Sequence, residues 1–179
     1  MKSSPNTLRM LVHETRGAEI AEAAAVLPLM FMMLLGIFWF GQAFSIYGAI
    51  TRAAQEGARA GAVPSCTTCT PLTATNRALH ALAAVESALT VAKLDPALAR
   101  RSSTSAPSCG GGAPPACTAG ISKVCVQDRV QLSNTTTGTG VCGVSVTFEY
   151  PFQFWLPFTS LNRQRIWLLA SARVRLENQ

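Results

Sequence analysis

Charged residues are scarce in this chain, and none lies between Glu22 and Arg52. Only 13% of the 179 residues are Asp, Glu, Lys or Arg, whereas 49% are apolar. A helix needs about 20 apolar residues to cross the core of a bilayer, and residues 23–50 exceed that number. A cleaved secretory signal is excluded, because its apolar region has only roughly 7–15 residues. We therefore predict a retained transmembrane helix at about 23–47.

A dense block of basic residues is also missing, although the net charge is +6. Lys and Arg are spread over the N-terminal leader, the pair Arg100–Arg101 and the stretch from Arg163 to Arg175. Nucleic-acid binding is typically accompanied by a basic stripe, often with aromatic residues or a known binding module. We expect no nucleic-acid partner.

Histidine is nearly absent, since the chain contains only His13 and His80. A zinc site would need paired Cys-x-x-Cys units or neighbouring histidines, so we expect no metal. The single Cys66-Thr-Thr-Cys69 unit fits a structural clip or a redox pair. A redox pair usually lies in a thioredoxin-like βαβ context, which the sequence lacks, and the clip is therefore favoured.

No cysteine precedes the apolar run, and the six that follow it are Cys66, Cys69, Cys109, Cys117, Cys125 and Cys142. An even number confined to one part of a chain is typical of disulfides formed in an oxidising compartment. Six cysteines allow 15 pairings, among which sequence cannot choose. Proximity along the chain favours Cys66–Cys69, Cys109–Cys117 and Cys125–Cys142.

Catalytic patterns are missing as well. Gly110-Gly-Gly112 is too short for a phosphate-binding loop, and the carboxylates show no spacing of a catalytic pair. No nucleophile is accompanied by a base and an orienting group. We predict no enzyme activity, no catalytic residue and no cofactor. A membrane-tethered periplasmic enzyme or redox protein is kept as the rival from another functional class.

What the chain does contain is one long helix-compatible segment and a globular remainder. We predict a leader at 1–17, a helix at 18–62 and an α+β domain with disulfides at 63–179. The leader carries Lys2, Arg9 and Arg16 against Glu14. Positive residues favour the cytoplasmic side of a membrane, which predicts a single-pass protein with its domain outside the cytoplasm.

Within the domain, the apolar stripe of Leu72, Leu79, Leu82, Val85 and Leu89 predicts a second helix at about 72–93. Residues 101–120 are rich in Ser, Gly and Pro and predict a loop. Alternating apolar residues predict strands at about 124–132, with a break near 127–128, at 144–150 and at 166–176. The expected fold is α+β, with an antiparallel sheet of about three to four strands packed on the long helix.

Aromatic residues gather at the end of the strand predicted at 144–150 and within the crossing loop predicted at 151–165. They are Tyr150, Phe152, Phe154, Trp155 and Phe158. One interpretation is a plug in the core between sheet and helix. The alternative is an exposed docking surface for another subunit, which is less favoured because large exposed apolar patches are uncommon.

Glu22 directly precedes the apolar run and lies five positions after Gly17. It is either a boundary charge at a helix N-terminus, which the helix dipole favours, or a partner for an amine. Cleavage after Gly17 would give Ala18 a free, positively charged α-amine. Glu22 would then neutralise this amine, or the amine of a neighbouring subunit, and set the assembly register.

Four segments resemble TadE-like proteins of the type IVb (Flp, tight-adherence) pilus system. They are Gly17-Ala-Glu-Ile-Ala-Glu22, Gly36-Ile-Phe-Trp-Phe-Gly41, Ala53-Ala-Gln-Glu-Gly-Ala-Arg-Ala60, and the terminal part with Val144-Ser-Val-Thr-Phe-Glu-Tyr-Pro-Phe152 and Leu168-Leu-Ala-Ser-Ala172. The third segment is the most specific of them. The resemblance covers residues 16–62 and 142–177.

The resemblance implies a pilin-like fold and a minor pseudopilin used in assembling a Flp-type pilus or related secretion apparatus. Gly17 and Ala18 would flank the prepilin-peptidase cut, and Glu22 would be the fifth-position glutamate. In one departure, Ala23 follows Glu22 where the major Flp pilins have an aromatic residue. A permanently anchored, unprocessed TadG-like protein is the alternative.

The resemblance also implies partners and a location. The partners would be other pilins or pseudopilins, inner-membrane assembly proteins of the Tad system, the prepilin peptidase and membrane lipid. The protein would span the bacterial inner membrane once, with its N-terminus cytoplasmic and its domain periplasmic. It would either stay there or enter an extracellular pilus.

Overall fold

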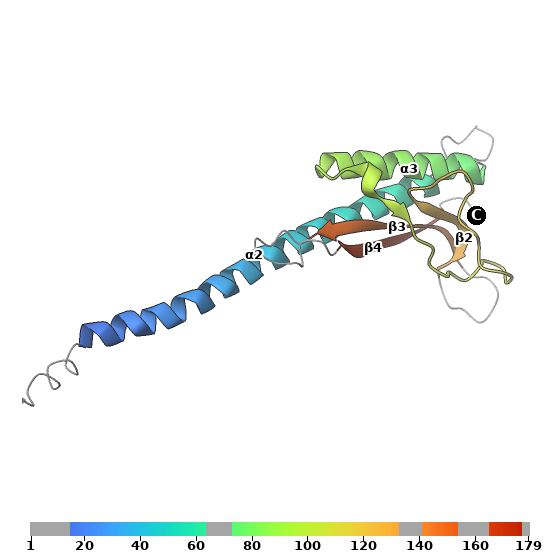
Figure 1. Cartoon of the computed structure of the whole chain (residues 1–179). Helices are drawn as coiled ribbons and strands as arrows, with labels where there is room; N and C mark the ends of the chain where they lie inside the picture. Colours follow the sequence, from blue (N-terminus) through green and yellow to red (C-terminus); the bar gives the residue numbers. More distant parts are fainter. Residues whose placement is uncertain (1–14, 64–72, 133–140, 154–164, 177–179) are drawn as a thin grey trace, which may run out of the picture. The chain divides into compact units, whose positions relative to one another are not determined.

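The computed structural model describes residues 15–63, 73–132, 141–153 and 165–176. The chain divides into two compact units, Met1–Gln42 and Ala43–Gln179, which are described separately below. In chain order the elements are α2 (Thr15–Ala62), α3 (Ala74–Val91), the 3-10 turn η1 (Pro96–Leu98), β1 (Arg100–Arg101), β2 (Cys125–Gln131), β3 (Cys142–Gln153) and β4 (Arg165–Arg175) (Figure 1).

The first unit consists, in its described part, of the beginning of α2. Many of its side chains are large and apolar, and these are mostly exposed rather than buried in a core. Met32 is 77% exposed and Leu29 70% exposed. The predicted long helix is confirmed, and it begins three residues before the expected Ala18.

In the second unit, the end of α2 packs against α3. The buried residues of α3 are Ala78, Ala81, Val85 and Leu89. The predicted stripe is wrong at Leu79, which is 51% exposed, and Leu72 lies outside the described residues. Ala81 and Val85 face α2 at its glycines, because a Cβ atom on Gly57 would meet both residues and one on Gly61 would meet the Ala81 side chain. Thr73 caps α3 by accepting a hydrogen bond from Asn76 N at 3.3 Å.

The sheet of the second unit is antiparallel and has β3 at its centre. β4 pairs along one edge of β3, from Gly143↔Arg175 to Gln153↔Arg165. The other edge is shared, because β2 pairs with the first half of β3 and β1 pairs with Phe148 and Glu149. The expected α+β architecture, with a sheet of four strands packed against the helices, is confirmed.

The hydrophobic core lies between this sheet and the two helices. β3 contributes Val144, Val146, Phe148 and Tyr150 on its helix-facing side. The end of α2 contributes a set of small or β-branched residues, namely Ile50, Ala53, Ala54, Ala58 and Ala62. Alternation along β3 follows from the pleat of a strand, which turns successive side chains to opposite faces.

The opposite face of β3 is polar and is covered by the segment after β1. Ser145 and Thr147 are fully buried there. The Thr104 and Thr147 hydroxyl groups lie 3.3 Å apart, and Gln127 Nε2 donates to Pro115 O at 2.7 Å. The Ser-, Gly- and Pro-rich stretch was predicted as a surface loop, and it serves as a cover for the sheet.

β2 carries the irregularity that its sequence indicates. Its register with β3 shifts between Gln127 and Val130, and Arg129 adopts a positive φ of 57°. The predicted break at 127–128 therefore corresponds to a β-bulge. β1 was not predicted, because two consecutive arginines show no alternation of polar and apolar residues.

The disulfides Cys109–Cys142 and Cys117–Cys125 correct two of the pairings favoured by chain proximity. Backbone hydrogen bonds with β2 decide the pairing. Cys109 N donates to Arg129 O at 2.9 Å and Thr118 N donates to Val126 O at 3.0 Å. These contacts bring Cys109 near the start of β3 and Cys117 beside the start of β2. Cys66 and Cys69 lie outside the described residues.

The aromatic stretch is resolved for its first two members. Tyr150 and Phe152 are each only 4% exposed, on a β3 strand that continues to Gln153. The core interpretation is confirmed for both of them, and the expected end of the strand at residue 150 is wrong. Phe154, Trp155 and Phe158 lie outside the described residues, as do leader residues 1–14.

Candidate functional site

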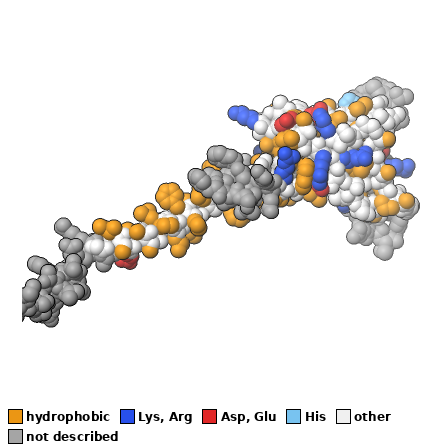
Figure 2. All heavy atoms as spheres, in the orientation of Figure 1, with side chains coloured by type: hydrophobic (Ala, Val, Ile, Leu, Met, Phe, Trp, Pro, Cys, Tyr) orange, Lys and Arg blue, Asp and Glu red, His pale blue; other side chains and the backbone are white. Residues whose placement is uncertain are grey.

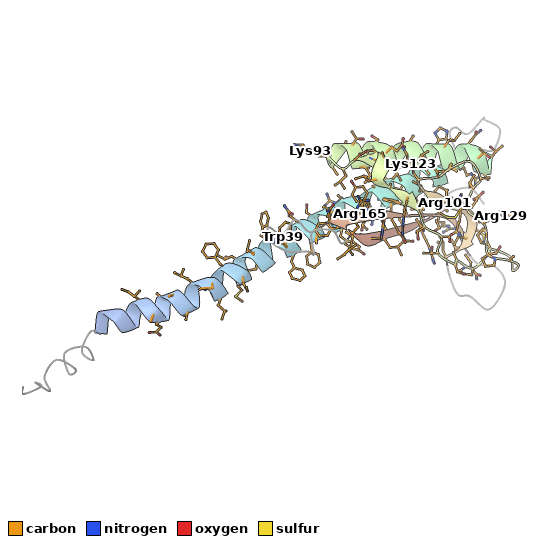
Figure 3. The ribbon with its side chains drawn as sticks, viewed as in Figure 1. Trp39, Lys93, Arg101, Lys123, Arg129 and Arg165 are labelled. Atoms are coloured by element: carbon orange, nitrogen blue, oxygen red, sulfur yellow. A yellow bond between two sulfur atoms is a disulfide. The ribbon has the colours of Figure 1, made fainter. Side chains whose placement is uncertain are left out.

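The apolar surface of α2 is the largest feature of the first unit. Apolar side chains project from the helix on more than one side, as Figure 2 and Figure 3 show. Phe31 is 63% exposed and Met33 66% exposed. Exposed apolar surface of this extent marks a membrane or protein contact. Ile20–Ala62 is long and apolar enough to cross a membrane, which suggests a single-pass anchor.

Gly17 and Glu22 lie at the start of this surface. Gly17 is in the first turn of α2, and a Cβ atom placed on it would meet nothing within 4 Å. Glu22 is exposed. Glu22 follows Ala18 by four residues, about one turn of the helix. Among the described residues, no cation forms an ion pair with Glu22.

The segment from Ala53 to Ala60 divides into two faces. Ala53, Ala54 and Ala58 are fully buried. Gly57 lies where α2, α3 and β3 meet, and a Cβ atom there would be 2.5 Å from Val85 Cγ2 and 3.1 Å from Ala81 O. Small residues at these positions are what allow the two helices and the sheet to approach each other.

The other face of the same segment carries charge to the solvent. Glu56 Oε1 and Arg59 Nη1 lie 3.8 Å apart, with side chains 58% and 70% exposed. An exposed pair of this kind adds little to stability. These two side chains are available to a partner, whereas the buried alanines and Gly57 serve the fold of the second unit.

A groove lies between α2 and α3, beside Glu56, with a volume of about 590 Å³. Its walls are mostly small side chains, and the charged groups among its lining residues are Arg52 and Glu56; the full set is Ala49, Arg52, Glu56, Ala84, Ser87, Ala88, Val91 and Ala92. The lining residues include no histidine or cysteine.

Glu149 has the most strongly organised surroundings of the acidic residues. Arg100 Nη2 lies 2.7 Å from Glu149 Oε2, and Ser102 donates to Oε1 at 2.9 Å. The hydrogen bond from Arg100, followed by that from Ser102, lowers the pKa of Glu149 below its ordinary value of 4.5. The Arg100 guanidinium also stacks on Trp167, 3.6 Å from the ring centroid.

Tyr150 connects the core of the sheet to the turn after α3. Its hydroxyl oxygen accepts a hydrogen bond from Asp95 N at 3.1 Å. Burial raises the pKa of Tyr150 above its ordinary value of 10.0, because the ionised phenolate would lose its water. Asp95 also caps η1 by accepting from Ala97 N at 2.8 Å. The role of these contacts is structural.

Metal-binding clusters are not found in the part of the chain that the structure describes, where no three His, Cys, Asp or Glu residues gather. The ion pairs that sequence reasoning missed join distant segments. Arg77 pairs with Asp128 at 3.0 Å and Lys123 with Glu86 at 2.6 Å. No local spacing signals such pairs, because the packing of α3 beside the start of the sheet creates them.

Comparison with known proteins identifies the segment around these features. Residues 17–59 match the sequence model of the family described as TadE-like protein. No curated protein and no solved structure matches the chain. The matched segment begins at Gly17, includes Glu22 and the apolar surface of α2, and ends at Arg59. The matched segment is therefore similar to TadE-like proteins, and this similarity suggests a component related to the Tad pilus.

Proposed function

We propose that this protein is a minor pseudopilin, a structural or assembly component of a Flp/Tad-type pilus or related secretion apparatus. The observation that carries the proposal is the apolar surface of α2, which begins directly after Glu22 and has no core of its own to enter. A helix of this kind packs with lipid and with the equivalent helices of other subunits.

The proposed topology follows from the leader and the disulfides. The N-terminus would be cytoplasmic, because the leader is basic. The second unit would be periplasmic, where its disulfides are stable. The small-residue face of α2 holds that unit together, while Glu56 and Arg59 remain available to other subunits.

In this proposal the prepilin peptidase cuts between Gly17 and Ala18. The cut would remove three residues of α2, since the helix begins at Thr15. The new α-amine of Ala18 would lie one turn from the Glu22 carboxylate. In a low-dielectric bundle this pair attracts more strongly than in water, and it would fix how far neighbouring helices are displaced along one another.

Complementation in the bacterium that produces the protein tests this role. Deleting the gene should abolish or sharply reduce Tad pili, and the full chain should restore them. Glu22→Ala should fail to restore pili while the protein still accumulates. Glu19→Ala is the matched control and should restore them, because no glycine lies five residues before Glu19. Normal piliation in the deletion strain would contradict the proposal.

A further inference from the structure

The outer edge of β4 is open along its length in the part of the chain that the structure describes. β3 occupies only one side of β4, with an unbroken register from residue 165 to residue 175. No described strand pairs with the other side. An open edge presents unpaired backbone groups that another strand can bond.

The direction of those backbone groups follows from one hydrogen bond. Leu176 N donates to Cys142 O at 3.1 Å, so the even-numbered position bonds toward β3. Antiparallel ladders alternate between bonded and non-bonded pairs. The N–H and C=O groups of the odd-numbered residues therefore point outward; these residues are Arg165, Trp167, Leu169, Ser171, Arg173 and Arg175.

The same six residues place their side chains on the sheet face away from the helices, and all six are exposed. Trp167 and Leu169 form an apolar patch, 37% and 42% exposed, and the Arg100 guanidinium stacks on one face of the Trp167 ring. The three arginines stand on either side of this patch, and Figure 3 labels Arg165 at its beginning. We call these six residues the β4 strip.

Charge on the β4 strip is uncompensated by the described residues. Glu149 lies opposite Leu169 in the register, but Arg100 and Ser102 already bind both of its oxygen atoms. No described carboxylate forms an ion pair with an arginine of the strip. Lys and Arg side chains are also prominent over the visible face of the second unit in Figure 2.

We propose that the β4 strip binds an extended, acidic segment of another polypeptide, which adds to the sheet as a further strand. Backbone hydrogen bonds would supply affinity, and alternate side chains would supply selection. Acidic residues would face the arginines and an apolar residue would cover Trp167 and Leu169. Arginine on an edge discourages unselective pairing, so the same charges would also exclude strands that lack acids.

Two other occupants fit less well. A second copy of β4 would bring three more arginines and no carboxylate on that face, and like charges across a strand pair are destabilising. An anionic lipid surface would satisfy the arginines but would leave the outward backbone groups of Leu169 and Ser171 without a strand. The proposal is independent of leader cleavage and of the pseudopilin role.

A designed peptide tests the proposal on the full chain in phosphatidylcholine nanodiscs. The peptide is a Thr-rich strand with Glu at the positions opposite the three arginines and Val opposite Trp167 and Leu169. It should bind saturably in fluorescence anisotropy. The double variant Arg173→Glu with Arg175→Glu should bind it about tenfold or more weakly. A peptide with Lys in place of Glu should not bind.

Replacing Ser171 by proline distinguishes binding by strand addition from binding to the arginine charges alone. Ser171→Pro removes an outward N–H and leaves the backbone bonds to β3, although it loses the contact of the Ser171 hydroxyl with Thr147 Oγ1 at 3.3 Å. Because the backbone pairing remains, the variant should fold and should bind at least about tenfold more weakly. Ser171→Ala keeps the N–H and should bind like the wild type. If Ser171→Pro does not fold, hydrogen exchange on the wild-type protein takes its place as the test. Bound peptide should then slow the hydrogen exchange of the backbone amides of Leu169, Ser171 and Arg173.

Three results would overturn the proposal. The first is no binding of the acidic peptide. The second is undiminished binding by a folded Ser171→Pro variant, or unprotected amides in the exchange experiment. The third is attachment to phosphatidylglycerol nanodiscs that requires Arg173 and Arg175 and is unaffected by Ser171→Pro, which would identify the strip as a site for an anionic membrane surface.

Discussion

The two halves of α2 differ in the size of their apolar side chains and in where those side chains go. In the first unit the apolar residues are mostly Leu, Met and Phe, and they are exposed. In the second unit, from Ile50 to Ala62, they are mainly Ala, with Gly57 among them, and most are buried against α3 and β3, whereas Phe44 and Tyr47 before Ile50 are exposed. Large exposed residues indicate partners outside the chain, whereas small buried residues indicate partners within it.

The first prediction concerns the part of α2 that lies in the first unit. Leu34→Arg combined with Leu35→Arg should release the protein from carbonate-washed membranes, because each arginine at a helix centre costs roughly 2.5–3.5 kcal/mol of insertion free energy. Both leucines are exposed in the first unit. Gln55→Arg is the control on the exposed face of the second unit, and this variant should remain membrane-bound. Retention of the double variant would contradict the membrane assignment.

The second prediction concerns the internal contacts of the second unit. Removing Cys109–Cys142 should lower its free energy of unfolding by about 4 kcal/mol, and removing Cys117–Cys125 by about 2–3 kcal/mol, because the loops that they close span 33 and 8 residues. Denaturant unfolding of the double-serine variants measures both values. Membrane attachment should be unaffected. Peptide mapping without reduction that recovers Cys109–Cys117 would contradict the pairing.

The third prediction replaces a small residue by a larger one in the part of α2 that lies in the second unit. Gly57→Ala should lower the free energy of unfolding by about 1–3 kcal/mol, because its Cβ atom would crowd Val85 and Ala81. Gly48→Ala is the matched control on the same helix. It meets nothing within 4 Å, so the better helix propensity of alanine should raise stability by up to about 1 kcal/mol. Equal effects of the two changes on thermal unfolding would argue against the close approach.

The fourth and smallest effect is a pH dependence confined to the second unit. The pKa of Glu149 is lowered from 4.5 in the folded state. The folded state therefore binds fewer protons, and this contribution to stability is present above pH 4.5 and is lost as the pH falls through the lowered pKa. Urea unfolding of Glu149→Gln should show a flatter acid dependence than the wild type. An unchanged acid slope would show that the Arg100 pair does not hold in solution.

Local sequence patterns were sufficient for the elements that have strong periodicity. The uncharged run predicted α2, and alternation predicted β3 and β4 to within a few residues. The bulge in β2 was visible as an interruption at Gln127-Asp128. In each case the deciding interaction, either burial on one face or insertion into lipid, acts on neighbouring residues of one segment.

Features that depend on contacts between distant segments were not predictable in this way. The disulfide pairing follows from hydrogen bonds between the loop after β1 and β2, and chain proximity therefore indicated the wrong partners for Cys109 and Cys125. Leu79 was placed in the core although Ala78 is the buried residue. Helix periodicity gives the apolar side, but the distance between packed helices decides which size of residue lies there.

N-terminal sequencing of the protein, produced together with a prepilin peptidase, tests the central claim most directly. The account predicts a mature chain that begins at Ala18, and loss of this processing when Gly17 is replaced by Ala. Persistence of Met1, with no effect of Gly17→Ala, would contradict the pseudopilin role and favour a permanently anchored protein. The part of α2 in the first unit would then have lipid, rather than other pilin helices, as its main partner.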